Sequence, residues 1–216
     1  MSKNRTTEFW MHGWGLGDFF FAPLQKSSQE EVTLGNQGYF DSKSMPADPP
    51  KRLLAHSLGL HLVPQPWFAQ VEELILLGSF LSFHSPSVPR SERAVKRMIS
   101  KFEKEPQQVL EEFYCNCFYP QETPIRPQVN FKAGLILEDL HLLDQQRLDP
   151  ALLQSIPRIL ILQGEEDVIV PTERAKDLQS HLPQAQMKIL QGAGHGFPYS
   201  HAVETWEAIQ AWRKND

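Results

Sequence analysis

The sequence has few cysteines, no excess of positive charge and no long apolar run, and each shortage excludes a class of protein. Cys115 and Cys117 are the only two cysteines among 216 residues. A single pair at this spacing indicates neither a structural zinc site nor a disulfide framework, so we expect reduced thiols in a cytosolic protein. The formal net charge of −5 argues against nucleic acid as the main partner, because binding the phosphate backbone requires a basic surface.

Signals for export or membrane insertion are also lacking. The N-terminus leads into a short apolar stretch that His12 and Gly13 interrupt, so no secretory signal is predicted. The longest apolar run, 74–83, contains Gly78 and two serines and falls short of the roughly 18 residues of a spanning helix. We therefore expect a cytoplasmic monomer that needs no cofactor, no metal and no membrane.

Short apolar segments alternate with helical patterns along much of the chain. Strands are expected at residues 7–11, 31–34, 53–56, 73–78, 158–164 and 187–190. Helices are expected at 18–26, at 58–70 with interruptions at Pro64 and Pro66, at 91–104, 107–114 and 135–146, and a final amphipathic helix at 201–214. This alternation predicts an α/β fold with a mostly parallel sheet, helices on both faces and right-handed crossovers.

Residues 86–155 show helical patterns and no convincing strand. The clearest helix, 91–104, has one apolar stripe at helical spacing. An insertion after the fourth strand would lie over the C-terminal strand ends, where open α/β sheets bind ligands. We therefore expect a core of residues 1–85 and 156–216 with a helical lid of residues 86–155.

Segment 51–60 has the pattern of a nucleophile elbow, in which a strand turns sharply into a helix and lifts one serine above the sheet. The usual motif is G-x-S-x-G; here Ala55 replaces the first glycine, Ser57 is the serine, and Gly59 is the second glycine. Alanine is the smallest departure that this crowded turn allows. The alternative is that Ser57 caps the N-terminus of a helix.

Glycines 13, 15 and 17 follow the first expected strand and invite two interpretations. The first interpretation is a phosphate-binding loop. The sequence argues against it, because it lacks the Gly-Lys-Ser/Thr ending of such a loop and has no acidic residue after the next strand to hold a ribose. In an oxyanion loop, the backbone N–H after His12-Gly13 would point at the oxyanion of an acyl transfer. That N–H belongs to Trp14.

Ser57, Asp167 and His195 each directly follow an expected strand. Serine, acid and histidine in this chain order are typical of α/β-hydrolases. The imidazole would take the serine's proton, while the carboxylate would orient and stabilise the imidazole. Glu165 and Glu166 stay open as alternative acids, and the histidines that compete with His195 are His12, His56, His141 and His201.

Over nearly its whole length the chain resembles the α/β-hydrolases, and among them the pimeloyl-acyl-carrier-protein methyl ester esterases of biotin synthesis. The resemblance is carried by the His-Gly-Trp-Gly-Leu sequence from residue 12, the Ser-Leu-Gly elbow and the placement of the lid. It implies a shortened hydrolase whose oxyanion donors are the N–H groups of Trp14 and Leu58. The antiparallel strand pair that usually begins such a sheet is absent, and the helix before the elbow strand is nearly missing.

The resemblance also implies docking of an acidic carrier protein on basic lid residues. A basic stripe runs along the helix at 91–104, although its alternative role is that of a solvated helix face. The stripe consists of Arg90, Arg93, Arg97, Lys101 and Lys104. By position, Phe80, Met98 or Phe113 would contact the acyl chain.

The expected reaction is hydrolysis of the methyl ester of the pimeloyl group on its carrier protein. A thioesterase, a short-chain carboxylesterase or a lyase of the menaquinone pathway would use the same fold and residues, because pocket shape selects the reaction. A protein of this fold that only binds a carrier or an acyl ligand is a further alternative.

Overall fold

The computed structural model describes residues 8–84 and 90–214, and it is built on one six-stranded sheet. All five strand pairings are parallel, in the order β2-β1-β3-β4-β5-β6. This confirms the expected α/β fold and its parallel sheet of six strands. The strands are β1 (Glu8–Met11), β2 (Thr33–Leu34), β3 (Arg52–His56), β4 (Glu73–Leu77), β5 (Arg158–Gly164) and β6 (Gln186–Leu190).

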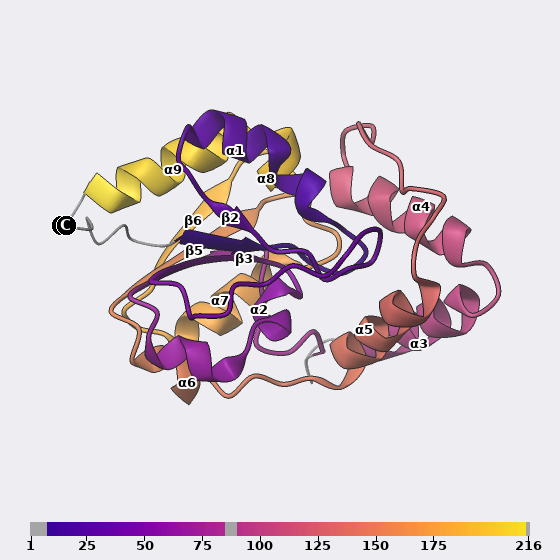
Figure 1. Ribbon diagram of the computed structural model, residues 1–216, viewed down its shortest axis with the longest axis horizontal. Coiled ribbons are helices and arrows are strands. Elements are labelled where there is room, and N and C mark those ends of the chain that lie inside the picture. The colour runs from indigo at the N-terminus through magenta and orange to yellow at the C-terminus, as the bar shows by residue number, and fades with distance from the viewer. Residues whose placement is uncertain (1–7, 85–89, 215–216) are drawn as a thin grey trace.

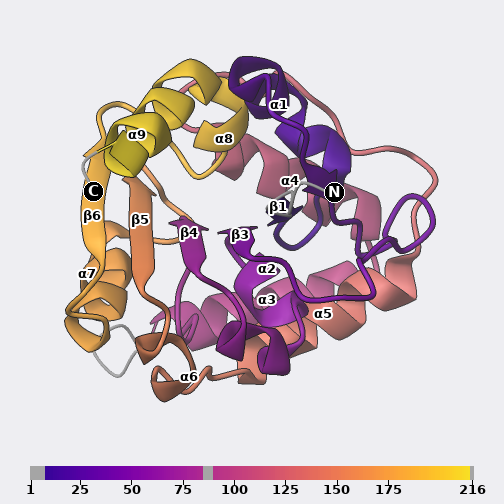
Figure 2. The ribbon, with the colours of Figure 1, turned by 60° about the vertical axis from the view of Figure 1, so that its left-hand side comes forward.

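Both faces of the sheet are covered by helices, so alternate residues of each strand enter different cores. Trp10, Leu54 and Ile75 belong to one apolar cluster, whereas Phe9 and Leu53 belong to the other. The first cluster is covered by α1 (Ala22–Ser28), α8 (Phe197–Ser200) and α9 (Ala202–Lys214). The second is covered by α2 (Gly59–Leu62), the 3-10 helix η2 (Gln65–Ala69), α6 (Ala151–Gln154) and α7 (Thr172–His181) (Figures 1 and 2).

Three helices from the chain between β4 and β5 lie beyond the C-terminal ends of the strands (Figure 1). They are α3 (Arg90–Phe102), α4 (Pro106–Phe118) and α5 (Ala133–Gln145), and α3 packs against both others. The fourth helix of this segment, α6, packs against η2 instead. We call α3, α4 and α5 the lid.

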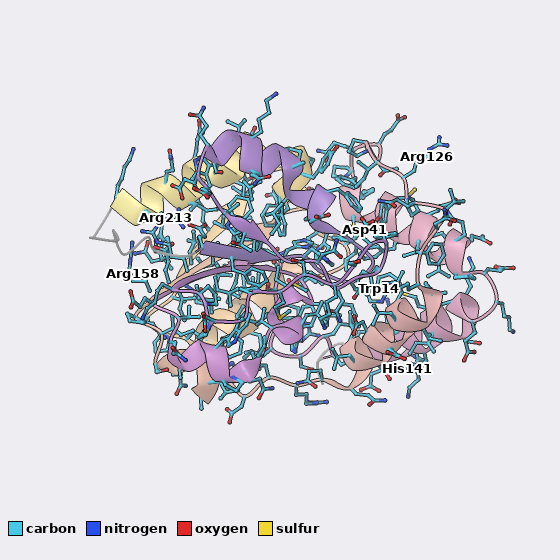
Figure 3. The ribbon with its side chains drawn as sticks, in the orientation of Figure 1. Trp14, Asp41, Arg126, His141, Arg158 and Arg213 are labelled. Atoms are coloured by element: carbon cyan, nitrogen blue, oxygen red, sulfur yellow. The ribbon has the colours of Figure 1, made fainter. Side chains whose placement is uncertain are left out.

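The N-terminal ends of four neighbouring strands carry charges of alternating sign. Glu8 of β1 is paired in register with Arg52 of β3, which is paired with Glu73 of β4, and Glu73 is paired with Arg158 of β5. Arg213 of α9 reaches this edge and contacts Glu8 at 2.9 Å and Glu73 at 2.6 Å. Figure 3 shows Arg158 and Arg213 at the end of the molecule far from the lid.

Several helices differ from the expected ones. The helix expected at 18–26 begins as a 3-10 helix, η1 (Asp18–Phe21), before α1. The interruption expected in the helix after the elbow is present: Pro64 and Pro66 separate a single turn, α2, from η2. Helix α7 had no counterpart among the expected elements. No helix in the described ranges is long and apolar enough to cross a membrane.

Candidate active site

The chain makes a tight turn at Ser57, between β3 and α2. Ser57 has φ of +54°, a left-handed conformation that is rare for residues other than glycine, and its N–H donates to Leu77 O at 2.9 Å. A Cβ on Gly59 would lie 2.5 Å from Met11 O, so only glycine fits at this position. Ser57 does not cap α2, whose N-cap is Leu58 without a side-chain hydrogen bond. The geometry is that of a nucleophile elbow despite Ala55, which is fully buried in β3.

Asp167 and His195 come from the loops after β5 and β6 and meet beside β4. His195 Nδ1 donates to Asp167 Oδ2 at 2.7 Å, and both side chains are fully buried. The same oxygen accepts from Gln163 Nε2 at 3.1 Å, while Oδ1 accepts from the N–H groups of Ile169 and Val170. These four hydrogen bonds hold the carboxylate in one orientation, so that it can in turn orient the imidazole.

The alternative acids and histidines lie elsewhere or make other contacts. Glu165 is exposed and accepts from the N–H of Gly192 at 3.0 Å, and Glu166 is also exposed. His141 is exposed on the lid, and His201 contacts Ser200 Oγ. Of the candidate acids and histidines, Asp167 and His195 are hydrogen-bonded to each other in the described structure.

Ser57 and His195 are linked through β4. Ser57 bonds to Leu77, and the next residue, Gly78, lies against the imidazole: a Cβ there would be 3.2 Å from His195 Nδ1. The buried Nε2 of His195 has no hydrogen-bond partner in the described residues. A hydrogen bond from Ser57 to His195 is therefore not formed in this state; such contacts often tighten only in the substrate complex.

His56, which precedes the serine, packs against His195 with ring centroids 4.7 Å apart. Its Nε2 donates to His195 O at 3.1 Å. Burial holds the pKa of His56 well below its ordinary value, and proximity to His195 lowers it further. His56 is therefore neutral near pH 7 and packs beside His195 without adding a second positive charge.

The loop after β1 presents a free N–H group at Trp14. Among the described residues neither the Trp14 N–H nor the Leu58 N–H has an acceptor, although both residues are buried. Unpaired buried N–H groups are rare in folded proteins. His12 holds the loop: Nδ1 donates to Gly13 O at 2.8 Å, and Nε2 accepts from the Gln37 N–H at 3.1 Å. Burial lowers the pKa of His12 to about 4.

The Trp14 side chain joins this loop to the lid (Figure 3). Its Nε1 donates to Ile136 O of α5 at 2.8 Å, and its ring packs edge-on against Phe113 of α4, with centroids 4.9 Å apart. Tyr114 of α4 also donates to Gly15 O at 2.9 Å. Two lid helices therefore help to set the position of the loop.

A cavity of about 500 Å³ lies between the lid and the strand ends, and Ser57 lines it. Met98 and Phe113 line it, as expected from their positions, but Phe80 instead packs on His61 and Phe83. Most of the lining is apolar, with four charged side chains. Besides Ser57, Met98 and Phe113, the lining residues are Trp14, Phe83, Arg90, Ser91, Ala94, Val95, Val109, Glu112, Asn116, Leu140, Leu143, Val168, Ile169, Pro171, Glu173 and Arg174.

Three contributors to this site were not expected from the sequence. Gln163 bonds to Asp167, Gly78 makes room for His195, and Arg174 of α7 lines the cavity. Gln163 carries one visible signal, since it is a polar residue in an otherwise apolar strand. Arg174 has no such signal in the sequence, because the residues next to it in the chain do not indicate that it is buried.

Known proteins resemble this chain in structure far more than in sequence. Residues 141–207, which include Asp167 and His195, match the family Abhydrolase_4, described as TAP-like protein. No curated protein matches. An esterase from Exiguobacterium antarcticum superposes with a TM-score of 0.81 at 16% identity, covering 98% of this chain and 92% of that one. The chain has the α/β-hydrolase fold.

Other α/β-hydrolase-fold structures agree with this assignment. A bromoperoxidase from Bacillus anthracis has a TM-score of 0.79 at 17% identity, covering 98% of this chain and 93% of that one. MenH from S. aureus has a TM-score of 0.74 at 12% identity, covering 99% and 95%. At these identities the likeness establishes the fold and leaves the reaction to the site.

Proposed function

We propose that this chain is a serine carboxylesterase, with Ser57 as nucleophile, His195 as general base and acid, and Asp167 as the group that orients His195. One observation carries the proposal. A serine in a left-handed turn lies at a cavity wall, next to a buried Asp–His pair whose outer nitrogen has no partner in the described residues. Such a nitrogen is available to take the serine's proton.

In the proposed reaction, His195 Nε2 accepts the proton of Ser57 Oγ as that oxygen bonds to the ester carbonyl carbon. The N–H groups of Trp14 and Leu58 donate to the oxyanion. Collapse of the intermediate breaks the bond to the alkoxy group, which leaves as an alcohol with the proton from His195. Water then attacks the acyl-enzyme with His195 as base, which releases the acid and restores Ser57.

For the substrate we propose the methyl ester of a pimeloyl group on its carrier protein. Support comes from the motif resemblance around Trp14 and Ser57, the largely apolar cavity and the basic stripe on the lid. Arg90, Arg93, Arg97 and Lys104 of the stripe are exposed, whereas Lys101 pairs with Glu112 at 2.5 Å. Exposed arginines and lysines suit an acidic protein partner.

The decisive experiment measures loss of the methyl group from this carrier-linked ester, by mass, with Ser57→Ala beside the wild type. The wild type should demethylate it, and Ser57→Ala should lower the rate by about 10⁵-fold or more. A serine-reactive phosphonate should label the wild type at Ser57. Substantial hydrolysis by Ser57→Ala would refute the mechanism, and cleavage of simple esters alone would refute the carrier-linked substrate.

The role of the basic stripe has its own test. The double charge reversal Arg93→Glu/Arg97→Glu should reduce turnover of the carrier-linked ester at least about tenfold more than turnover of a small ester. The matched control is Lys26→Glu/Lys176→Glu, which reverses two exposed charges on α1 and α7. Equal effects on both substrates would refute docking on α3.

Other outcomes would redirect the assignment within the same fold. Faster cleavage of the carrier thioester than of the methyl ester would indicate a thioesterase. Elimination without uptake of water would indicate a lyase. A panel of candidate substrates tests for this reaction. Failure of the phosphonate to label Ser57, with no ester cleaved, would leave a binding protein of α/β-hydrolase fold.

A further inference from the structure

Arg174 lies in the first turn of α7, seven residues beyond Asp167, and lines the cavity that contains Ser57. Only 8% of the residue is exposed. Its neighbours along the helix, Ala175 and Leu178, are buried in the apolar core between α7 and the sheet. The guanidinium is therefore held at the cavity wall by a helix that packs firmly on the sheet.

Within the described residues, the Arg174 guanidinium has neither a hydrogen bond nor an ion pair. This is unusual in this protein, because Arg213, whose side chain is 12% exposed, pairs with Glu8, Glu73 and Glu30. Burial lowers the pKa of Arg174 from its ordinary value, while the charges of Asp177 and Glu173 oppose that shift. Most of the residue is withdrawn from water, whereas the guanidinium nitrogens are not among the fully buried unpartnered atoms and stay open to the cavity.

The other charged residues that line the cavity lie at its exposed rim. Arg90, Glu112 and Glu173 are exposed, and Glu112 already accepts from Lys101 and Gln108. Among the four charged lining residues, Arg174 is the one whose residue is largely buried. Arg174 offers the cavity a fork of N–H donors whose geometry matches a carboxylate.

We propose that Arg174 binds a carboxylate on the far end of the substrate's acyl chain, so that the enzyme prefers half esters of dicarboxylic acids. The inference rests on the proposed esterase activity and extends it to free half esters. The carrier-linked ester ends in a thioester and does not supply this carboxylate. The ester carbonyl lies at Ser57, the methylene chain fills the apolar cavity, and the carboxylate supplies the partner that Arg174 lacks. A neutral ester of the same length leaves the guanidinium unpaired.

The test compares the monomethyl and dimethyl esters of the same acids, from succinate to azelate, by methanol release. The wild type should show a higher kcat/KM for the monomethyl ester at its preferred length. Arg174→Met, which retains an unbranched apolar stem and removes the guanidinium, should lower the monomethyl-to-dimethyl ratio of kcat/KM by about 10- to 100-fold, mainly through KM. Arg174→Lys should restore part of the ratio, since it retains the charge and loses the fork.

Lys176→Met is the matched control, because Lys176 is exposed on the same helix and does not line the cavity. Its ratio should equal that of the wild type. An unchanged ratio in Arg174→Met would overturn the proposal. So would an equal loss on both esters with a lower Tm, which would identify a structural role; the proposal expects the Tm of unliganded Arg174→Met to be equal or higher.

A binding measurement separates this inference from the proposed reaction. Calorimetry with the saturated dicarboxylates should show binding to Ser57→Ala, weakened at least about tenfold by adding Arg174→Met. Equal affinity of the two variants would overturn the role of Arg174 even if esters are hydrolysed, whereas a clear difference would support it even if no ester is. An effect of Arg174→Met confined to carrier-linked esters would assign the anion to the carrier's phosphate and overturn the carboxylate.

Discussion

In the described part of the chain, charged groups are paired at the N-terminal ends of the strands, and several polar groups are unpaired at the C-terminal ends. At the N-terminal ends, Glu8, Arg52, Glu73 and Arg158 alternate in sign across four strands, and Arg213 joins them. At the C-terminal ends, the N–H groups of Trp14 and Leu58, the His195 Nε2 and the Arg174 guanidinium have no partner among the described residues. In Figure 3 the labelled Arg158 and Arg213 lie at one end and Trp14 at the other.

This contrast separates stability from function. Paired charges at one edge join four strands and α9, and they leave little for a ligand to bind. Unpaired donors at the other edge cost stability, because buried polar groups without partners are unfavourable. These donors surround one cavity. There they can bind an anionic reaction intermediate and an anionic group of the substrate.

The largest expected effect at the C-terminal end comes from Asp167→Asn. The amide would donate to His195 Nδ1 and favour the wrong tautomer, so kcat for ester hydrolysis should fall by about 10⁴-fold while the fold persists. Steady-state kinetics and a thermal melt check this. Glu166→Gln, an exposed neighbour, should change little, and an Asp167→Asn enzyme within tenfold of the wild type would place the orienting acid elsewhere.

At the N-terminal end, Glu73→Gln should act on stability instead. Glu73 is 4% exposed and contacts Arg213 at 2.6 Å and Arg158 at 3.1 Å. Removing its charge weakens its contacts to both cations, although Arg213 keeps Glu8 and Glu30, and should cost about 2–3 kcal/mol of unfolding free energy in urea titrations.

The matched control for that change is Glu72→Gln, since Glu72 forms an exposed pair with Lys51 and should contribute less than about 1 kcal/mol. Ester turnover per folded molecule should be the same in both variants. A large loss of kcat in folded Glu73→Gln would show that the two ends of the sheet are not independent.

A smaller effect should follow from pH. His12 has a pKa of about 4 in the folded protein, below that of an exposed histidine, so the unfolded chain binds more protons below about pH 6.5. Stability should therefore fall as the pH is lowered from 7 to 5, with His12 contributing about 2 kcal/mol of the loss.

Urea titrations at the two pH values measure this dependence. His12→Asn should reduce it, and the exposed His141→Asn should not. An identical pH dependence in His12→Asn and the wild type would show that His12 does not carry the effect.

Much of the fold could be predicted because it depends on local patterns. Apolar runs located the strands, and small residues two positions before and after Ser57, Ala55 and Gly59, indicated the elbow. Ala55 fits because its side chain lies in the core beneath the sheet, whereas Gly59 cannot be replaced without moving Met11. The helix after the elbow is interrupted at Pro64 and Pro66, as proline chemistry predicts, and its second part is a 3-10 helix.

Roles within the site were predictable only as candidates. Asp167, Glu165 and Glu166 share one loop, and the sequence favours Asp167 but keeps the two glutamates as alternatives. In the structure only Asp167 is buried, and it lies 2.7 Å from His195. Phe80 and Phe113 were equal candidates for the acyl cavity, yet Phe80 packs on His61. Which side of a loop or helix faces a cavity depends on neighbours far away in the chain.

The sequence by itself determined the α/β class, the six strands and the order in which Ser57, Asp167 and His195 follow them, because hydrophobic periodicity and turn chemistry are local properties. The tertiary structure decided which polar groups around the cavity have no partner in the described residues, among them the Trp14 N–H, His195 Nε2 and the Arg174 guanidinium. Whether a polar group has a partner depends on packing between segments far apart in the chain. Such packing can exclude water from the group without supplying another hydrogen-bond partner.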